Sequence, residues 1–302
     1  MCGIVGYLDR TGSGAGTLGR TVLGMLNALG CRGPDSAGVA LYGKPLDAQL
    51  VARVAFGQQG DRNASAAKIL AAAARFAPVS DSSITDCYLR FVIGGQAGIQ
   101  PLIDAVESSE PGTEVVSLGR RLEIVKQVGS PENLEATYHV SGFEGSHGIG
   151  HTRLSTESRV DLSHSQPFWG HGCPDLAIAH NGHITNYHQL RRRYEQRGIR
   201  FYTENDSEIV AIYLARQFGA GHTLDEAFES MLGDLDGSFS CVVATESQIG
   251  FVKDRFALKP LLFAETGDFV AIATEEIAIR NALPGNYAVR EAQAKECRTW
   301  RR

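Results

Sequence analysis

Two spacings of apolar residues alternate along the chain and predict a protein built from both strands and helices. Short apolar runs of roughly four to eight residues, bounded by glycine or polar residues, are typical of buried strands. The runs of this kind are residues 3–8, 36–42, 50–56, 87–93, 114–118, 122–128, 176–180, 239–244, 250–253, 261–264 and 269–274. A further buried strand is expected to end at Arg153.

Apolar residues that recur three or four positions apart predict amphipathic helices. These segments are residues 17–29, 65–76, 99–108, 187–197, 209–218, 224–232 and 275–282. A short helix is also expected after Ser130, which suits an N-cap, and Pro131, which suits the first helical position. There are no internal repeats and no low-complexity linkers.

The segment 43–146 differs from the rest of the chain in the order of its predicted elements. It alternates strands and helices in a β-α-β-α-β order, and we find no catalytic group of residues within it. We therefore expect one large domain over residues 1–302 that contains a small inserted α/β unit at 43–146. The expected role of the insertion is structural, or docking to another chain.

The composition limits the class of protein. The 302 residues are 43% hydrophobic and 21% charged, with a net charge of −5, so no footprint for nucleic acid or anionic membrane is visible. No apolar run approaches the roughly 20 residues of a membrane span, and Asp9 and Arg10 come too early for a secretory signal. The six cysteines are scattered without a C-x-x-C pair, which indicates a reducing cytoplasm and no structural zinc.

His180 and His183, with His188 nearby, could suggest a metal site. No carboxylate or cysteine stands at ligand spacing from these histidines. The sequence therefore predicts no metal.

Cys2 is the first candidate for chemistry. If Met1 is removed, Cys2 carries a thiol and a free α-amine, and an α-amine with a pKa of roughly 7.7–8.0 can act as the base for its own nucleophile. Gly3 is expected to let substrate approach the backbone. Two other interpretations of Cys2 remain open: a small residue after the start codon, or a lipidation site, for which the preceding apolar run is missing.

Other polar motifs also have structural interpretations. Residues 32–36 could form an ordinary loop. Asn181-Gly182 could form a hairpin turn between two apolar segments. Asn205 with Glu208 three positions later could form a capping box at the start of a helix.

Taken together and in order, these motifs form a recognisable set. The set is Met1-Cys2-Gly3-Ile4-Val5-Gly6, Arg32-Gly33-Pro34-Asp35-Ser36, Gly150-His151-Thr152-Arg153-Leu154-Ser155-Thr156, Gln166-Pro167-Phe168, His180-Asn181-Gly182, Asn205-Asp206-Ser207-Glu208, Asp236-Gly237-Ser238-Phe239, Asp254-Arg255-Phe256-Ala257-Leu258-Lys259-Pro260-Leu261 and Ala273-Thr274-Glu275-Glu276.

This set resembles the class II glutamine amidotransferases, of the N-terminal-nucleophile hydrolase superfamily. The resemblance covers nearly the whole chain except about 43–146. Within the class, the insertion, Thr156-Glu157-Ser158 and the C-terminal pattern look most like the glutaminase subunit of N-methylglutamate synthase and related glutamate-synthase-like enzymes. Many members instead carry His-Gly after that threonine. The implied fold is α+β, a four-layer αββα sandwich of two mostly antiparallel sheets between helical layers.

The resemblance also implies roles for individual residues. Cys2 would attack the side-chain amide of glutamine and form a thioester, while Asn181 and Gly182 would stabilise the oxyanion. The expected contacts to the substrate carboxylate and ammonium come from Arg153, Thr156 and Asp206, and Arg32 is expected to support the nucleophile loop.

The resemblance finally implies a partner. The motifs run to Glu276, and residues 277–302 are too few for an acceptor domain, so the ammonia acceptor is expected on another polypeptide. No cofactor is expected in this chain, and a flavin only in that partner. Two rival interpretations remain: a free-standing N-terminal-nucleophile amide hydrolase, and a non-catalytic regulatory subunit on the same fold.

Overall fold

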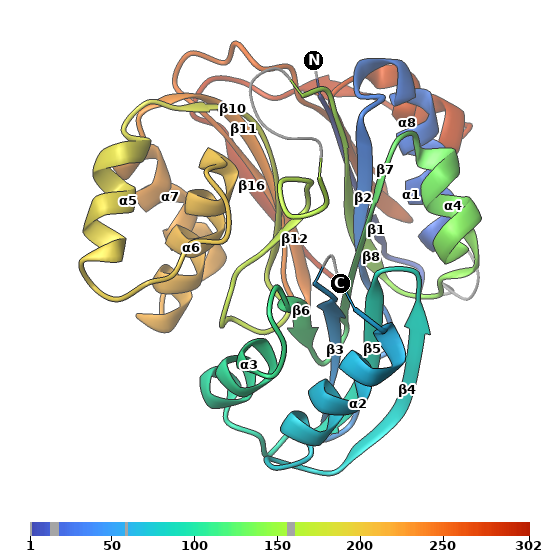
Figure 1. The fold of residues 1–302 in the computed structure, drawn as a ribbon. Helices are drawn as coiled ribbons and strands as arrows, with labels where there is room; N and C mark the ends of the chain where they lie inside the picture. The colour runs from blue at the N-terminus through green and yellow to red at the C-terminus, as the bar shows by residue number, and fades with distance from the viewer. Residues whose placement is uncertain (1, 13–17, 58–59, 156–160) are drawn as a thin grey trace.

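The computed structural model describes residues 2–12, 18–57, 60–155 and 161–302. Two antiparallel sheets stack face to face in the middle of the molecule, and helices cover both outer faces (Figure 1). This is the four-layer α+β sandwich that the resemblance implied. Apolar side chains of both sheets, among them Val242, Ile249 and Ile272, are fully buried in one core between them.

The larger sheet has the strand order β15-β13-β14-β1-β8-β2-β7. Its strands are β1 (Gly3–Asp9), β2 (Ser36–Tyr42), β7 (Leu122–Val128), β8 (His147–Arg153), β13 (Leu262–Glu265), β14 (Phe269–Ala273) and β15 (Arg290–Glu291). On its outer face lie α1 (Leu18–Ala28), α4 (Pro131–Tyr138) and α8 (Glu276–Ala282).

The second sheet has the strand order β16-β12-β11-β10-β9. Its strands are β9 (Phe168–Trp169), β10 (Ala177–Ile184), β11 (Gly237–Ala244), β12 (Gln248–Lys253) and β16 (Cys297–Arg301). The helices on this side are α5 (Tyr187–Glu195), α6 (Asp206–Gly219) and α7 (Leu224–Asp234).

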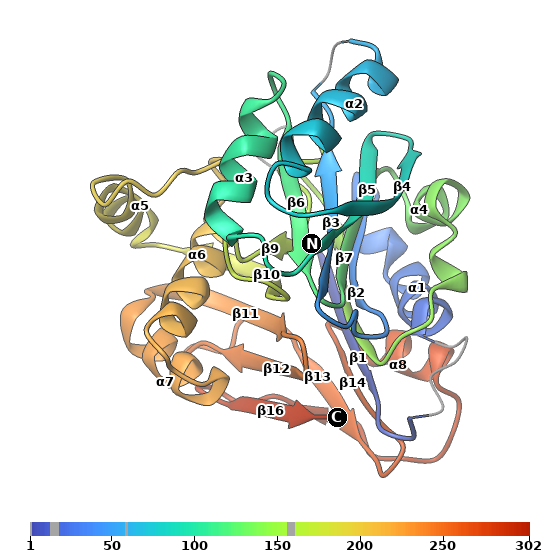
Figure 2. The same cartoon turned by 90° about the horizontal axis from the view of Figure 1, so that it is seen from below.

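A third, four-stranded sheet lies beside the sandwich and is seen from below in Figure 2. It is formed by β3 (Gln49–Ala55), β4 (Val79–Thr85), β5 (Tyr88–Gly94) and β6 (Glu114–Gly119), with α2 (Arg62–Ala73) and α3 (Ile99–Ser108) packed on one another. Strand β7 and helix α4, which also fall within 43–146, belong instead to the larger sheet and its helical layer. The boundary of the insertion stays a prediction.

Four strands that the apolar pattern did not indicate, β4, β9, β15 and β16, are edge strands. Strand β4 has the sequence VSDSSIT and is largely exposed, and β16 is the outer strand of the second sheet with the sequence CRTWR. Edge strands are held by backbone hydrogen bonds on one side and need few buried side chains. An apolar periodicity therefore does not reveal them.

Short 3₁₀ turns complete the chain at Gly30–Arg32 and Val140–Gly142. Within the described residues, no helix is both long enough and apolar enough to cross a membrane.

Candidate active site

Residues from four separate elements line one open cleft of about 710 Å³ beside the second sheet. Cys2 directly precedes β1, Arg153 is the last residue of β8, Asn181 and Gly182 lie in β10, and Asp206 is the first residue of α6. Of the other predicted site residues, Thr156 lies outside the described residues. Arg32 lies behind Cys2 and does not line the cleft.

The pairing of β1 with β8 brings Cys2 to the mouth of this cleft. Gly3 is paired with Thr152 in antiparallel register, so Cys2 and Arg153 end up side by side at the same end of the two strands. The Cys2 Sγ accepts a hydrogen bond from the Leu154 N–H at 3.4 Å and lies 3.7 Å from the Leu154 carbonyl oxygen. The thiol is thus half-buried against the chain that follows Arg153.

Hydrogen bonds from three directions fix the backbone around Cys2. Its carbonyl oxygen accepts from Asn181 Nδ2 at 3.1 Å and from Arg32 Nε at 3.4 Å. The next strand residue but one, Ile4, donates to Thr274 Oγ1 at 2.8 Å and accepts from the Thr274 N–H at 3.0 Å. The position of the nucleophile candidate is therefore set by Asn181 on β10, by Thr274 directly after β14 and by Arg32 in the 3₁₀ turn after α1.

The segment 32–36 is not an ordinary loop. Arg32 forms an ion pair with Glu275, and a Cβ at Gly33 would lie 2.4 Å from the Thr152 carbonyl carbon, so the chain passes directly against β8. Asp35 donates its N–H to the Arg153 carbonyl at 3.0 Å and accepts from the Ser155 N–H at 2.7 Å through Oδ2. This segment holds the end of β8 in place.

Gly3 has a different role from the one predicted. A Cβ at this position would lie 2.8 Å from Thr152 Oγ1 and 2.9 Å from Leu29 Cβ, so the missing side chain makes room for packing inside the protein. The residue is buried and absent from the cleft lining. The expectation that Gly3 opens the backbone to substrate was wrong.

Asn181 and Gly182 do not form a hairpin turn. Strand β10 continues through both, with Asn181 opposite Ser240 and Gly182 opposite Phe239. Gly182 has φ +144°, and a Cβ there would lie 2.2 Å from the Ser238 carbonyl oxygen, so only glycine fits this backbone. The local turn signal was misleading because β11 supplies the pairing that keeps the chain extended.

A buried histidine orients the Asn181 side chain. His151 Nε2 lies 3.1 Å from Asn181 Oδ1, and burial lowers the pKa of His151 to about 3, so the ring is neutral. Since the amide oxygen can only accept, Nε2 carries the proton and donates it. Nδ2 of Asn181 is then turned toward Cys2. His151 belongs to the motif that begins at Gly150, but the motif alone did not predict this contact.

The Asp206 carboxylate both accepts a backbone hydrogen bond and lines the cleft. Its Oδ2 accepts from the Ile184 N–H at 2.8 Å and lies 3.8 Å from His183 Nδ1, while its carboxylate also lines the cleft. Within the described residues, Oδ1 accepts no hydrogen bond; it lies 4.0 Å from His180 Nδ1. One carboxylate oxygen thus ties β10 to α6 and leaves the other for a cleft ligand.

The capping box predicted at Asn205 is only half present. Asn205 Oδ1 accepts from the Ser207 N–H at 3.0 Å, as an N-cap does. Glu208 does not return to Asn205: its carboxylate accepts from the N–H groups of Tyr202 at 2.7 Å and Thr203 at 2.8 Å. Glu208 therefore stabilises the chain before the helix, and the reciprocal cap was wrong.

His180 and Gln166 form a second buried contact in the wall of the cleft. Gln166 accepts from the His180 N–H at 2.7 Å and donates to its carbonyl at 2.8 Å, which copies a strand pairing with one side chain. His180 Nδ1 lies 2.8 Å from Ser207 Oγ, and burial lowers the pKa of this histidine. Both residues belong to motifs named in the sequence analysis, but the motifs alone did not predict these contacts.

The histidines do not gather as metal ligands. In the part of the chain that the structure describes, no group of three or more His, Cys, Asp or Glu side chains could hold a metal ion.

Comparison with known proteins shows the family of the chain. The family model described as "Glutamine amidotransferase domain" matches residues 151–281. A protein of Methanothermobacter thermautotrophicus named as a glutamine amidotransferase is 33% identical over 291 residues and covers 94% of each chain. The glutamine amidotransferase-like protein GlxB of Rhizobium meliloti is 36% identical over 281 residues, which cover 93% of this chain and 91% of that protein.

The fold is shared with solved structures. The glutamine phosphoribosylpyrophosphate amidotransferase of Bacillus subtilis, complexed with ADP and GMP, superposes with a TM-score of 0.63 at 20% identity. The match covers 99% of this chain and 49% of that one. The two proteins therefore share their fold. The chain belongs to the glutamine amidotransferase family.

Proposed function

We propose that this chain is a glutaminase subunit that hydrolyses glutamine through a thioester on Cys2 and supplies ammonia to a synthase subunit on another chain. The observation that carries the proposal is the meeting of Cys2, Arg153, Asn181 and Asp206 at one cleft. These side chains come from separate elements and together match the three polar ends of a free glutamine molecule.

The proposed reaction uses Cys2 with its own amine. After removal of Met1, the α-amine takes the thiol proton, and the thiolate attacks the side-chain amide carbon of glutamine. The proton passes to the departing nitrogen, which leaves as ammonia when the C–N bond breaks and the thioester forms. Water then attacks the thioester, which releases glutamate and restores the thiol.

Two donors are proposed for the negative oxygen of the tetrahedral intermediate. Asn181 Nδ2 already points at the Cys2 backbone, 3.1 Å from its carbonyl oxygen, and the Gly182 N–H follows on the same strand. Since donors fixed in advance cost no reorganisation during the reaction, their placement on a paired strand favours catalysis.

Binding of the amino-acid end is assigned to charged groups. We assign the substrate carboxylate to the Arg153 guanidinium, helped by Thr156, because a guanidinium fork can hold a carboxylate with two hydrogen bonds. The substrate ammonium is assigned to Asp206, through the oxygen that does not bind the Ile184 N–H. Arg32 supports the site from behind through the Cys2 carbonyl and Glu275.

The decisive experiment compares the processed chain with two altered forms in a glutaminase assay, with intact mass to define each N-terminus. Cys2→Ala should bind glutamine without turning it over. A chain that keeps Met1 should also be inactive, because the amine has become a non-basic amide. Full activity in a form proven to keep Met1 would reject the mechanism. Turnover of other amides but not glutamine would favour a free-standing amide hydrolase.

We propose a synthase partner from the resemblance of the motifs. The two relatives above have nearly the length of this chain, whereas an amidophosphoribosyltransferase of Methanothermobacter thermautotrophicus is matched over only 36% of its length. By resemblance, the partner would be a flavin-dependent glutamate synthase or N-methylglutamate synthase chain in the cytoplasm that adds ammonia or methylamine to 2-oxoglutarate. The unit at 43–146 is our candidate docking surface.

The partner proposal is tested by purifying the chain with its native partners. Glutamate release should be low for the chain alone and should rise when partner, 2-oxoglutarate and reductant are added. Equal rates would reject coupling. A chain lacking the 43–146 unit that folds and still assembles would reject the docking role.

A further inference from the structure

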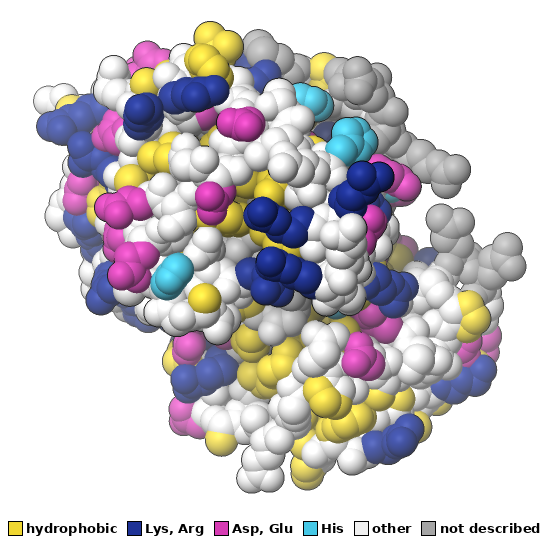
Figure 3. Space-filling view, turned by 90° about the vertical axis from the view of Figure 1, so that its left-hand side faces the viewer, with side chains coloured by type: hydrophobic (Ala, Val, Ile, Leu, Met, Phe, Trp, Pro, Cys, Tyr) yellow, Lys and Arg dark blue, Asp and Glu magenta, His cyan; other side chains and the backbone are white. Residues whose placement is uncertain are grey.

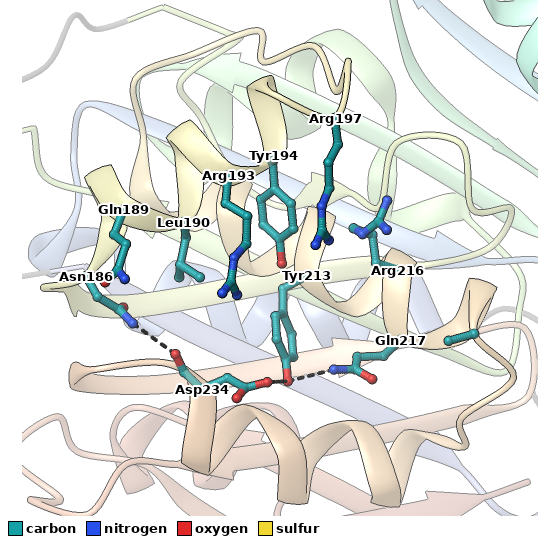
Figure 4. A pocket seen from close by; sticks show the side chains of 11 residues that line it. Asn186, Gln189, Leu190, Arg193, Tyr194, Arg197, Tyr213, Arg216, Gln217 and Asp234 are labelled. Atoms are coloured by element: carbon teal, nitrogen blue, oxygen red, sulfur yellow. Dashed lines mark hydrogen bonds between the residues drawn. The ribbon is translucent and has the colours of Figure 1, made fainter.

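A second pocket, of about 360 Å³, lies between α5 and α6 (Figure 4). None of its lining residues lines the cleft that holds Cys2. It therefore stands outside the proposed glutaminase chemistry, although both are bordered by α6.

Three arginines line this pocket from two helical segments. Arg193 lies on α5, Arg197 directly follows that helix, and Arg216 stands on α6. Figure 4 shows their guanidinium groups reaching into the space between the helices around Tyr194. Burial raises the pKa of Tyr194, and the charges of all three arginines oppose that rise, so the three cations lie close to one hydroxyl group.

Within the described residues, no carboxylate forms an ion pair with these arginines. Among the described residues, the side chains of Arg193, Arg197 and Arg216 make no hydrogen bond or ion pair, whereas the neighbouring Arg191 pairs with Glu195 at 2.8 Å. Asp234 is the one acidic residue of the lining, and its Oδ2 accepts from Tyr213 Oη at 2.7 Å. The pocket therefore has a surplus of positive charge.

The walls of the pocket are held by internal contacts. Asn186 Nδ2 donates to the Asp234 carbonyl at 2.9 Å, and Gln217 donates to Tyr213 Oη at 2.7 Å. The face that carries these helices is shown in Figure 3, where Lys and Arg side chains lie interspersed with Asp and Glu side chains. Walls held by hydrogen bonds, with three arginines of the same charge beside them, suit a site that an anion completes.

We propose that this pocket binds a small molecule through a phosphate group. Each guanidinium offers a planar fork of N–H donors that matches phosphate oxygens, and a dianion balances the charge surplus. The volume lies at the lower end of the range of about 300–1,000 Å³ for ligand pockets, which fits a compact phosphate ester. An acidic segment of a partner protein is the competing occupant.

The test is calorimetric titration of the full chain with inorganic phosphate and with AMP, in phosphate-free buffer at low ionic strength. Arg216→Gln and Arg193→Gln should each weaken binding about tenfold, equivalent to about 1.4 kcal/mol. Arg192→Gln is the matched control: it removes the same charge from the same helix, and Arg192 does not line this pocket. Its affinity should stay within about twofold of the unaltered chain.

The remaining outcomes decide against the proposal. No heat of binding for either probe at millimolar concentration would overturn it, and so would equal losses in Arg192→Gln and Arg216→Gln. Succinate binding as tightly as phosphate would remove the phosphate assignment. A polyaspartate peptide that binds while both small probes do not would assign the arginines to an acidic partner.

Discussion

His151 Nε2 lies 3.1 Å from Asn181 Oδ1, and the same amide donates through Nδ2 to the Cys2 carbonyl at 3.1 Å. The contact joins β8 to β10, which belong to different sheets. Because His151 is buried and neutral, its Nε2 proton fixes which end of the amide faces Cys2. The orientation of the proposed oxyanion donor is thus set from outside its own strand.

We expect His151→Phe to lower glutaminase kcat by about tenfold to a hundredfold and to leave the KM for glutamine nearly unchanged. Removal of an oxyanion donor typically costs about 10²–10³ in rate, and a misoriented donor costs part of that. Steady-state kinetics measures the split. His151→Gln, which restores an N–H donor, should recover part of kcat. A loss of thermal stability without any change in kcat would assign His151 to packing only.

Two variants of Asp206 should distinguish the effect of its charge on glutamine affinity from the effect of its hydrogen bond on stability. Asp206→Asn keeps an oxygen for the Ile184 N–H but loses the charge proposed to hold the substrate ammonium. It should weaken glutamine binding by about 1.5–3 kcal/mol with little change in thermal stability. Asp206→Ala should lose both affinity and stability. Calorimetry on the Cys2→Ala background measures affinity, and unchanged affinity in Asp206→Asn would leave Asp206 as a backbone tie alone.

Gly182→Ala should destabilise the fold by about 2 kcal/mol or more, since the new Cβ would meet the Ser238 carbonyl oxygen at a positive φ. The measurement is chemical denaturation monitored by circular dichroism. Gly233→Ala is the control, because Gly233 lies in α7 with no atom within 4 Å of the added Cβ. That change should stabilise by about 0.5–1 kcal/mol. Similar effects of both variants would contradict the strained backbone at Gly182.

Stability should fall as the pH drops below about 6.5. Burial lowers the pKa of both His147 and His151 from 6.5 to about 3. Between these pH values the two histidines bind protons in the unfolded chain but stay neutral in the folded chain. Between the folded and the unfolded pKa, each histidine makes the free energy of unfolding fall by about 1.4 kcal/mol for each pH unit lost. The raised pKa values of Glu107, Asp175 and Glu208, caused by burial, act in the opposite direction.

A variant isolates the histidine contribution to this slope. His147→Phe keeps the stacking on Tyr42 but loses hydrogen bonds to Ser146 Oγ and the Thr245 carbonyl, so it should be less stable at pH 8. Its stability should then decline less steeply between pH 6 and 5, by about 1.4 kcal/mol per pH unit. Denaturant titrations at these pH values measure both, and an unchanged slope would mean that His147 is protonated in the folded state.

Much of the fold could be predicted from apolar spacing. Ile99–Ser108 and Leu122–Val128 have the bounds that the sequence indicated, because each buries a regular set of apolar side chains. The strand β4 could not be found in this way, because its residues are polar and its pairing with β5 is made by the backbone. The strand at Asn181-Gly182 was mistaken for a possible turn, because its extended form depends on β11.

By itself, the sequence determined the family, the sandwich of sheets and helices, and the residue types available for chemistry. These follow from local spacing and from motifs in order, which are one-dimensional properties. Tertiary structure alone decided which of these residues share a cleft, how His151 turns the Asn181 amide, and that Gly3 serves packing. Such facts depend on the register of strands that are far apart in the chain, and register is fixed only when the sheets pair and their side chains pack.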